Sequence, residues 1–227
     1  MTQKPFLNLG CGRVILPAPK PAHHGLIPDG VHDYALWHNV DRNQQPGVDE
    51  VVDVFRYPFP WADNSFDGAL LTHLCEHIPH EIITTNRFAG VTWKDGQSNR
   101  PYEELPSNLA NMQDGWFAFF SELYRVLTPD SSIHVLSPYA WSHGAIVDPT
   151  HTRFLTPESF MHSMQPNPDA PFAYATGGLN LEMVGGGNFN VSDRFQHLAN
   201  QPELLWQAAS TQINVFYEFY VRLRVIK

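Results

Sequence analysis

The sequence contains few cysteines and few basic residues. Cys11 and Cys75 are the only cysteines among 227 residues, and both lie in apolar stretches. They are typical of small buried side chains in a reducing compartment and not of a disulfide framework. Lys and Arg number 14 against 23 Asp and Glu, which gives a formal net charge of -9. This balance argues against a general nucleic-acid binder, which needs a basic face to release phosphate counterions, although it leaves room for a local basic groove.

Long apolar runs are also missing. No stretch approaches the length that crosses a bilayer. Asn8 and Arg13 interrupt the first apolar segment, so it does not read as a signal peptide. Hydrophobic content of 43% and charged content of 16% are those of a globular protein, and 227 residues suit one domain. We therefore expect a single-domain cytoplasmic protein without membrane association.

Short apolar runs that end at glycine or polar residues predict an α/β fold. Helices are expected to begin near Glu76, after Asp114 and at Pro157, whereas the prolines between Arg13 and Gly30 argue against a long helix there. Strands alternating with helices predict a mostly parallel sheet covered on both faces. The expected strands are residues 6–9, 35–41, 48–54, 66–71, 133–137 and 179–184, followed by an alternating antiparallel strand with one buried face over 215–226.

Polar residues gather where these strands end. Ligands of parallel α/β sheets bind beyond the carboxyl ends of the strands, so residues at those ends should share one rim. Gly10 and Gly12 follow the first strand, and without a Cβ they let bare backbone approach a ligand. Asp41 ends the second strand and can accept hydrogen bonds from a ribose diol. The pattern predicts half of a nucleoside-cofactor site.

Several segments, in order, resemble the motifs of class I S-adenosylmethionine-dependent methyltransferases. One motif alone is weak, but a set in the right order over residues 5–138, about three-fifths of the chain, is specific. The resemblance implies a Rossmann-like three-layer sandwich with a mostly parallel seven-stranded sheet and an antiparallel C-terminal strand. The matching segments are Leu7–Gly12, Asn39–Asp41, Val52–Val54, Asp63–Ala69, Thr72–His77 and Leu123–Pro129.

The resemblance also implies S-adenosyl-L-methionine as cofactor. Asp41 would hold both ribose hydroxyls, Asp53 would accept from the adenine amino group, and the Val54 amide would donate to a ring nitrogen. Asn8 departs from the family, since many members carry an acid there. So does the proline-rich segment with His23 and His24, which replaces a helix. The full implied cofactor site is Asn8, Gly10, Cys11, Gly12, Asp41, Arg42, Asp53, Val54, Thr72 and His73.

The methyl acceptor is expected to be a small molecule, a sugar or a glycan-linked group, with transfer to oxygen slightly favoured over nitrogen. Signatures of DNA-base methyltransferases are absent, so no nucleic-acid partner is expected. A probable insertion near residues 86–106 and the elements after residue 138 would form the acceptor side. The sequence does not indicate an oligomeric state.

The loop after the fifth expected strand supplies the catalytic candidates His143, Asp148 and His151. A histidine that titrates near neutrality can remove the proton of a hydroxyl acceptor. Asp148 could orient His151 or contact the substrate, and Arg153 could hold an anionic group. Alternatively, Asp148 and Arg153 merely fix the loop before the next helix.

Two other functions remain open from the sequence. His73-x-x-Glu76-His77 also matches an inverted zinc-peptidase pattern, in which both histidines share a helical face and bind zinc while Glu76 is the base. The strand expected to end near Thr72 leaves His73 in a turn, so the cofactor interpretation is preferred and no metal is expected. The second alternative is a non-catalytic protein that binds S-adenosylmethionine without turnover.

Overall fold

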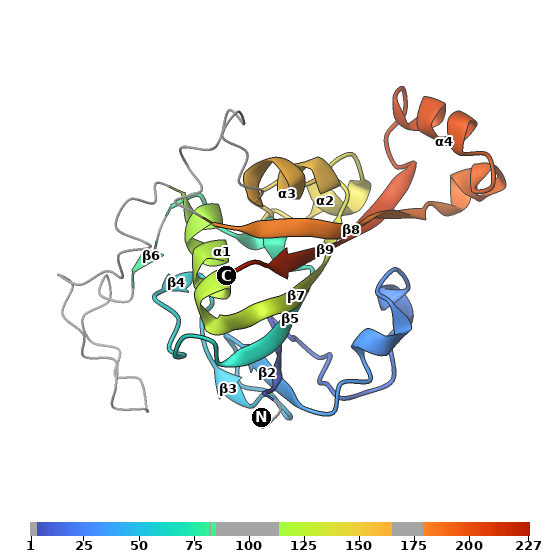
Figure 1. Ribbon diagram of the computed structural model, residues 1–227. Coiled ribbons are helices and arrows are strands. Elements are labelled where there is room, and N and C mark those ends of the chain that lie inside the picture. The colour runs from blue at the N-terminus through green and yellow to red at the C-terminus, as the bar shows by residue number, and fades with distance from the viewer. Residues whose placement is uncertain (1–3, 82, 85–113, 165–178) are drawn as a thin grey trace.

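The computed structural model describes residues 4–81, 83–84, 114–164 and 179–227. Its centre is a seven-stranded sheet of order β3-β2-β1-β5-β7-β9-β8 (Figure 1). β9 is antiparallel to both of its neighbours, and the other pairings are parallel. This arrangement confirms the predicted Rossmann-like fold class. The strands are β1 (Phe6–Leu9), β2 (Trp37–Asp41), β3 (Glu50–Val51), β5 (Phe66–Thr72), β7 (Leu127–Pro138), β8 (Leu181–Val191) and β9 (Phe216–Val225).

Two helices cover one face of the sheet, α1 (Gly115–Val126) and α3 (Pro157–Met164). Asp114 begins α1 as predicted, since its side chain accepts a hydrogen bond of 2.7 Å from the Trp116 amide. Apolar residues recur at helical spacing along α1, so Phe119, Phe120 and Leu123 are buried against the strands. A small parallel pair, β4 (Arg56–Tyr57) and β6 (Ile83–Thr84), lies beside α1.

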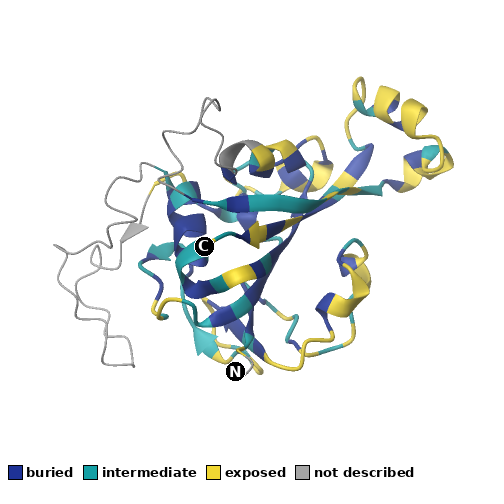
Figure 2. Ribbon diagram, in the orientation of Figure 1, coloured by how far each residue is buried: buried dark blue, intermediate teal, exposed yellow. Residues whose placement is uncertain are grey.

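The other face is covered by the proline-rich segment between β1 and β2, which contains the 3-10 turns η1 (Ala22–His24) and η2 (Asp29–Val31). The absence of a long helix here confirms the prediction from the prolines. Leu16, Ile27 and Val31 are buried against this face of the sheet. In Figure 2 much of the centre of the sheet is dark blue, β8 at its edge is mostly teal, and the segment between β1 and β2 carries exposed residues.

One predicted helix is wrong. The chain after β5 forms only a single 3-10 turn, η3 (Cys75–His77), and Ile78 is already extended. Pro79 explains the early end, because a residue that precedes proline disfavours the α region.

The prediction of one buried face for the last strand holds over its second half, where Val221, Leu223 and Val225 are buried while Arg222 and Arg224 are exposed. It fails nearer the start of β9, where Tyr217 is exposed and Tyr220 is buried together with residues of the proline-rich covering segment.

The remaining elements lie around the end of the sheet where the parallel strands finish. α2 (His143–Val147) follows β7, and η5 (Asp193–Leu198) with α4 (Pro202–Ala209) projects beyond β8 and β9 (Figure 1). None of the helices in the described ranges is both long and apolar enough to cross a membrane. The expected insertion at 86–106 lies outside the described residues.

Strand register brings the predicted polar residues to one edge. Leu9 is level with Val40 of β2 and with Leu71 of β5. Thr72 is level with Leu136 of β7. Because β9 runs the opposite way, its first residues meet the last residues of β7 at the same edge, and Pro138 pairs with Glu218.

Candidate functional site

The turn after β1 is built from two left-handed glycines. Gly10 and Gly12 have φ values of +63° and +52°. A Cβ on Gly10 would lie 2.8 Å from Cδ1 of Leu74, so this position has no room for a side chain. A Cβ on Gly12 would meet nothing nearer than the Gly10 carbonyl at 4.0 Å. Cys11 between them is buried, and burial, with Asp41 as a further cause, raises the pKa of its thiol to about 11.

Asp41 at the end of β2 contacts this turn directly. Its Oδ2 accepts a hydrogen bond of 2.9 Å from the Gly12 amide, and its Oδ1 accepts one of 2.8 Å from the Asn43 amide. The Asn43 side-chain amide also donates to Oδ1, at 3.3 Å, so of the about four acceptor sites of a carboxylate Asp41 retains about one for a further donor. The exposed Arg42 follows it. The structure therefore brings Gly12 and Asp41 together, as the strand ends predicted.

Asn8 serves an internal network. Its amide nitrogen donates to the Val14 carbonyl at 2.7 Å and to Oδ1 of Asn39 at 3.0 Å. The Asn39 side chain in turn accepts a hydrogen bond from the Leu16 amide and donates one to the Leu16 carbonyl. Asn8 is 1% exposed, so its amide group attaches the proline-rich covering segment to β1 and β2.

Asp53 and Val54 follow β3, on the far side of Asp41 from β1. The Asp53 carboxylate accepts a hydrogen bond of 2.9 Å from Nε of Arg56 and one of 3.2 Å from the Phe55 amide. Val54 is buried. The contact with any adenine ring stays a prediction for both residues.

His73 follows Thr72 at the end of β5 and adopts a left-handed backbone with φ of +51°. Its amide donates to the Leu136 carbonyl at 2.9 Å. Its Nε2 lies 3.1 Å from Oε1 of Glu218, and its Nδ1 lies 3.5 Å from Oε1 of Glu76. Burial disfavours the charged imidazole, but the contacts with the carboxylates of Glu218 and Glu76 outweigh burial and raise the pKa of His73 to about 9. Two carboxylates therefore flank one imidazole at this strand end.

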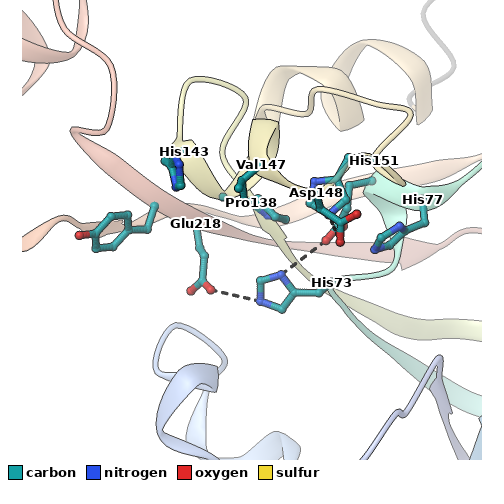
Figure 3. Close-up of a pocket in the computed structure, with 11 residues that line it drawn as sticks. His73, His77, Pro138, His143, Val147, Asp148, His151 and Glu218 are labelled. Carbon is teal, nitrogen blue, oxygen red and sulfur yellow. Dashed lines mark ion pairs between the residues drawn. The ribbon is translucent and has the colours of Figure 1, made fainter.

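A cavity of about 600 Å³ opens beside His73 (Figure 3). Residues from η3, the end of β7, α2, the following loop and the start of β9 form its wall. The lining residues are His73, Glu76, His77, Pro138, His143, Gly144, Val147, Asp148, His151, Tyr217 and Glu218.

The three predicted catalytic residues all line this cavity. Nδ1 of His151 lies 3.0 Å from the Ala145 carbonyl, and Nε2 lies 3.8 Å from Oδ2 of Asp148, too far for a hydrogen bond. Hydrogen bonds from Thr150 lower the pKa of Asp148. His143 is exposed at the first turn of α2 and stands at the opposite end of the cavity from His77 (Figure 3).

Arg153 does not face the cavity. Its Nε donates to the Ile78 carbonyl at 2.7 Å, and its Nη2 reaches the Pro79 carbonyl and Asp114. These contacts fix the loop before α3 against η3 and α1. Of the two predictions for Arg153, the structure confirms the loop-fixing role.

Three cavity residues were missed by the cofactor interpretation: Glu76, His77 and Glu218. Glu76 and His77 were noted only within the zinc pattern, and the helix that this pattern needs is not formed. Glu218 was placed on the outer face of an alternating strand. The signal that could have found Glu218 is its place near the start of an antiparallel strand, which begins at the rim.

Comparisons with known proteins identify no family for this chain. No family model and no curated protein matches the chain. One similar solved structure is an S-adenosylmethionine-dependent methyltransferase from Archaeoglobus fulgidus, 16% identical with a TM-score of 0.49, covering 98% of this chain and 86% of that one. The [4+2]-cyclase SpnF is 14% identical with a TM-score of 0.49, covering 99% and 75%. The YcgJ protein from Bacillus subtilis is 12% identical with a TM-score of 0.48, covering 99% and 93%. The function is therefore inferred from the residues of the site and not from these similarities.

Proposed function

We propose that the protein is an S-adenosyl-L-methionine-dependent methyltransferase acting on a small-molecule, sugar or glycan-linked acceptor, with transfer to oxygen favoured over nitrogen. The observation that carries the proposal is the contact between the left-handed Gly12 and the Asp41 carboxylate at adjacent strand ends. A glycine backbone without a side chain, next to a carboxylate that can still accept a hydrogen bond, fits the polar face of a nucleoside.

The residues at this rim fit the cofactor on chemical grounds. Gly12 leaves open space next to Asp41, where a Cβ would otherwise project. Asp41 would hold the ribose hydroxyls, while Asp53 and the Val54 amide would face adenine. Thr72 and His73 would line the sulfonium side. The two carboxylates beside His73, those of Glu76 and Glu218, support this placement, because a sulfonium is a cation.

S-adenosyl-L-methionine would supply a methyl group that its own positive charge activates. The protein must align the acceptor and exclude water, which effective-molarity arguments value at roughly 7–11 kcal/mol at best. The cavity next to His73 is the proposed acceptor site.

We assign the removal of the acceptor proton to Nε2 of His151. A carbonyl oxygen only accepts, so the 3.0 Å contact with Ala145 places the ring proton on Nδ1 and leaves the Nε2 lone pair for the substrate. Asp148 lies beside that nitrogen, and His143 would contact the acceptor from α2.

The cofactor claim is tested by binding of S-adenosylhomocysteine to Asp41→Ala. Lost charge-assisted hydrogen bonds should weaken binding by about 1–3 kcal/mol, which is about 5- to 150-fold in Kd. Isothermal titration calorimetry measures this, with Asp193→Ala, an exposed acid on η5, as the control that should bind like the wild type. Unchanged affinity in a folded Asp41→Ala protein would refute the ribose assignment.

The base assignment is tested once a methyl-transfer screen identifies an acceptor. The assay contains a chelator so that no divalent metal ion occupies the cavity histidines. His151→Ala should then lower kcat by about 10²–10⁴-fold, the usual contribution of a general base, and leave the affinity for S-adenosylhomocysteine unchanged. Equal turnover removes His151 from the mechanism. Cofactor binding without turnover on any acceptor would favour the non-catalytic alternative.

A further inference from the structure

Three side chains at one end of the cavity form a second set of possible ligands. Glu76, His77 and His151 each place a donor atom within 4.8 Å of the other two. Two segments far apart in the sequence supply them, η3 and the loop before α3. The amides of Thr152 and Arg153 both donate to the Glu76 carbonyl, at 2.8 and 3.1 Å, and hold the segments together. Figure 3 shows His77 and His151 on the same side of the cavity, with Asp148 between them.

Hydrogen bonding fixes which nitrogen of His77 is available. The Thr150 hydroxyl donates to Oδ1 of Asp148 at 2.6 Å, so its oxygen can only accept from Nδ1 of His77, 3.1 Å away. The Thr150 carbonyl, 3.3 Å from the same nitrogen, also only accepts. Nδ1 of His77 therefore carries the proton, and the lone pair is on Nε2.

His151 is arranged in the same way. Its Nδ1 donates to the Ala145 carbonyl at 3.0 Å, which leaves its lone pair on Nε2 as well. Metal-binding histidines usually donate their second ring nitrogen to a carbonyl or carboxylate in this manner. The η3 turn and the loop before α3 thus each present one imidazole whose Nδ1 is held by a hydrogen bond and whose Nε2 is left for a ligand.

Glu76 supplies an independent indication of a missing partner. The side chain is 1% exposed, and its Oε2 accepts from the Ser137 hydroxyl at 2.9 Å. Its Oε1 is buried and makes no hydrogen bond, with Nδ1 of His73 as a neighbour at 3.5 Å. A buried carboxylate oxygen without a hydrogen bond is costly, and the ion pair with His73 at 3.5 Å does not supply one, so Oε1 is suited to a ligand in the cavity.

We propose that Glu76, His77 and His151 bind one divalent transition-metal ion, with zinc as the best fit. Two imidazole nitrogens and one carboxylate oxygen are a usual zinc donor set, with the fourth position open. Donor atoms of a tetrahedral zinc site lie about 3.4 Å apart at bond lengths of about 2.0–2.1 Å, so separations of up to 4.8 Å close by small side-chain rotations. Asp148, 3.8 Å from Nε2 of His151, is the nearest additional carboxylate.

The proposed site differs from the helical zinc pattern of the sequence. His73 is not a ligand, because its two nitrogens face Glu76 and Glu218. Ion binding does not require the cofactor, so it stands independently of methyl transfer. The consequence for catalysis does rest on the proposed function. A bound ion would take the Nε2 lone pair of His151. As a Lewis acid it would lower the pKa of an acceptor hydroxyl, whose proton would then leave to solvent instead of to the imidazole.

The test is titration of the metal-stripped full-length chain with Zn²⁺ by calorimetry and with Co²⁺ by its visible absorption. One ion per chain is expected. His77→Ala and His151→Ala should each weaken binding by at least about 10-fold, since even outer partners of metal ligands are worth about 10- to 100-fold. His143→Ala, which removes a histidine of the same cavity, should bind the ion like the wild type.

His73→Gln distinguishes the proposed site from the helical zinc pattern, in which His73 is a ligand. This variant should also retain the ion. Circular dichroism shows whether each variant is folded, and binding of S-adenosylhomocysteine, measured in parallel, reports on the cofactor claim separately. No ion binding by the wild type, unchanged binding by both ligand variants, or loss of the ion in His73→Gln or His143→Ala would overturn the proposed site.

Discussion

Left-handed residues stand at two neighbouring strand ends of this sheet, Gly10 and Gly12 after β1 and His73 after β5. For glycine this conformation costs little, whereas a residue with a Cβ pays about 1–2 kcal/mol. His73 is held in it by contacts of its backbone amide with Leu136 and of its ring with two carboxylates. The left-handed conformation of the turn after β1 depends on its glycines, so a substitution there should change the free energy of unfolding measurably.

Gly10→Ala should lower the free energy of unfolding by about 2 kcal/mol or more. Alanine at a φ of +63° costs about 1–2 kcal/mol, and its Cβ would lie 2.8 Å from Leu74. Gly30→Ala is the matched control, because a Cβ there meets nothing within 4 Å. Urea unfolding of both variants measures the difference. Equal stability of the two would contradict the strained turn.

At the scale of elements, the sequence predicts what local chemistry determines. β1 ends at Leu9 because Gly10 follows, and α1 begins after Asp114 because that side chain caps it. The helix expected at Glu76 fails because Pro79 acts after only one turn. Strand positions that depend on distant partners were less predictable. β9 reads as a strand with one buried face, yet Tyr220 on its other face is buried together with residues of the covering segment.

The same division applies to the site. Gly12 and Asp41 could be placed together because parallel strands end at one edge, and their hydrogen bond now joins them. Glu218 could not be placed at the site from the sequence, because its position at the rim depends on the direction of β9. The cluster of Glu76, His77 and His151 depends on how the loop before α3 folds back on η3, through the backbone bonds to the Glu76 carbonyl. No spacing in the sequence encodes that contact.

At the scale of the whole molecule, buried histidines lie both in the covering segment and in the sheet. Nδ1 of His24 lies 3.0 Å from Nε2 of the buried His32 in that segment. His134 on β7 lies 2.8 Å from the Tyr220 hydroxyl of β9. Burial lowers the pKa of both His24 and His134 to about 4. His73 at the rim has the opposite shift, with a pKa of about 9.

These opposite shifts predict that stability is greatest near pH 6.5. His24 and His134 favour their neutral forms in the fold, so their contribution is full above about 6.5 and is lost as the pH falls toward 4. The loss is on the order of 2–3 kcal/mol for each, at 1.36 kcal/mol per pKa unit. The charged His73 contributes fully below about 6.5, and its contribution is lost as the pH rises toward 9.

Urea unfolding at a series of pH values should therefore give a maximum and a decline on both sides. His24→Gln cannot take up the proton, so its stability should fall less than that of the wild type between pH 6.5 and 4. His197→Gln, which removes an exposed histidine of η5, should follow the wild-type profile. If His24→Gln loses as much stability in acid as His197→Gln does, the buried imidazole does not connect the covering segment to the pH response of the fold.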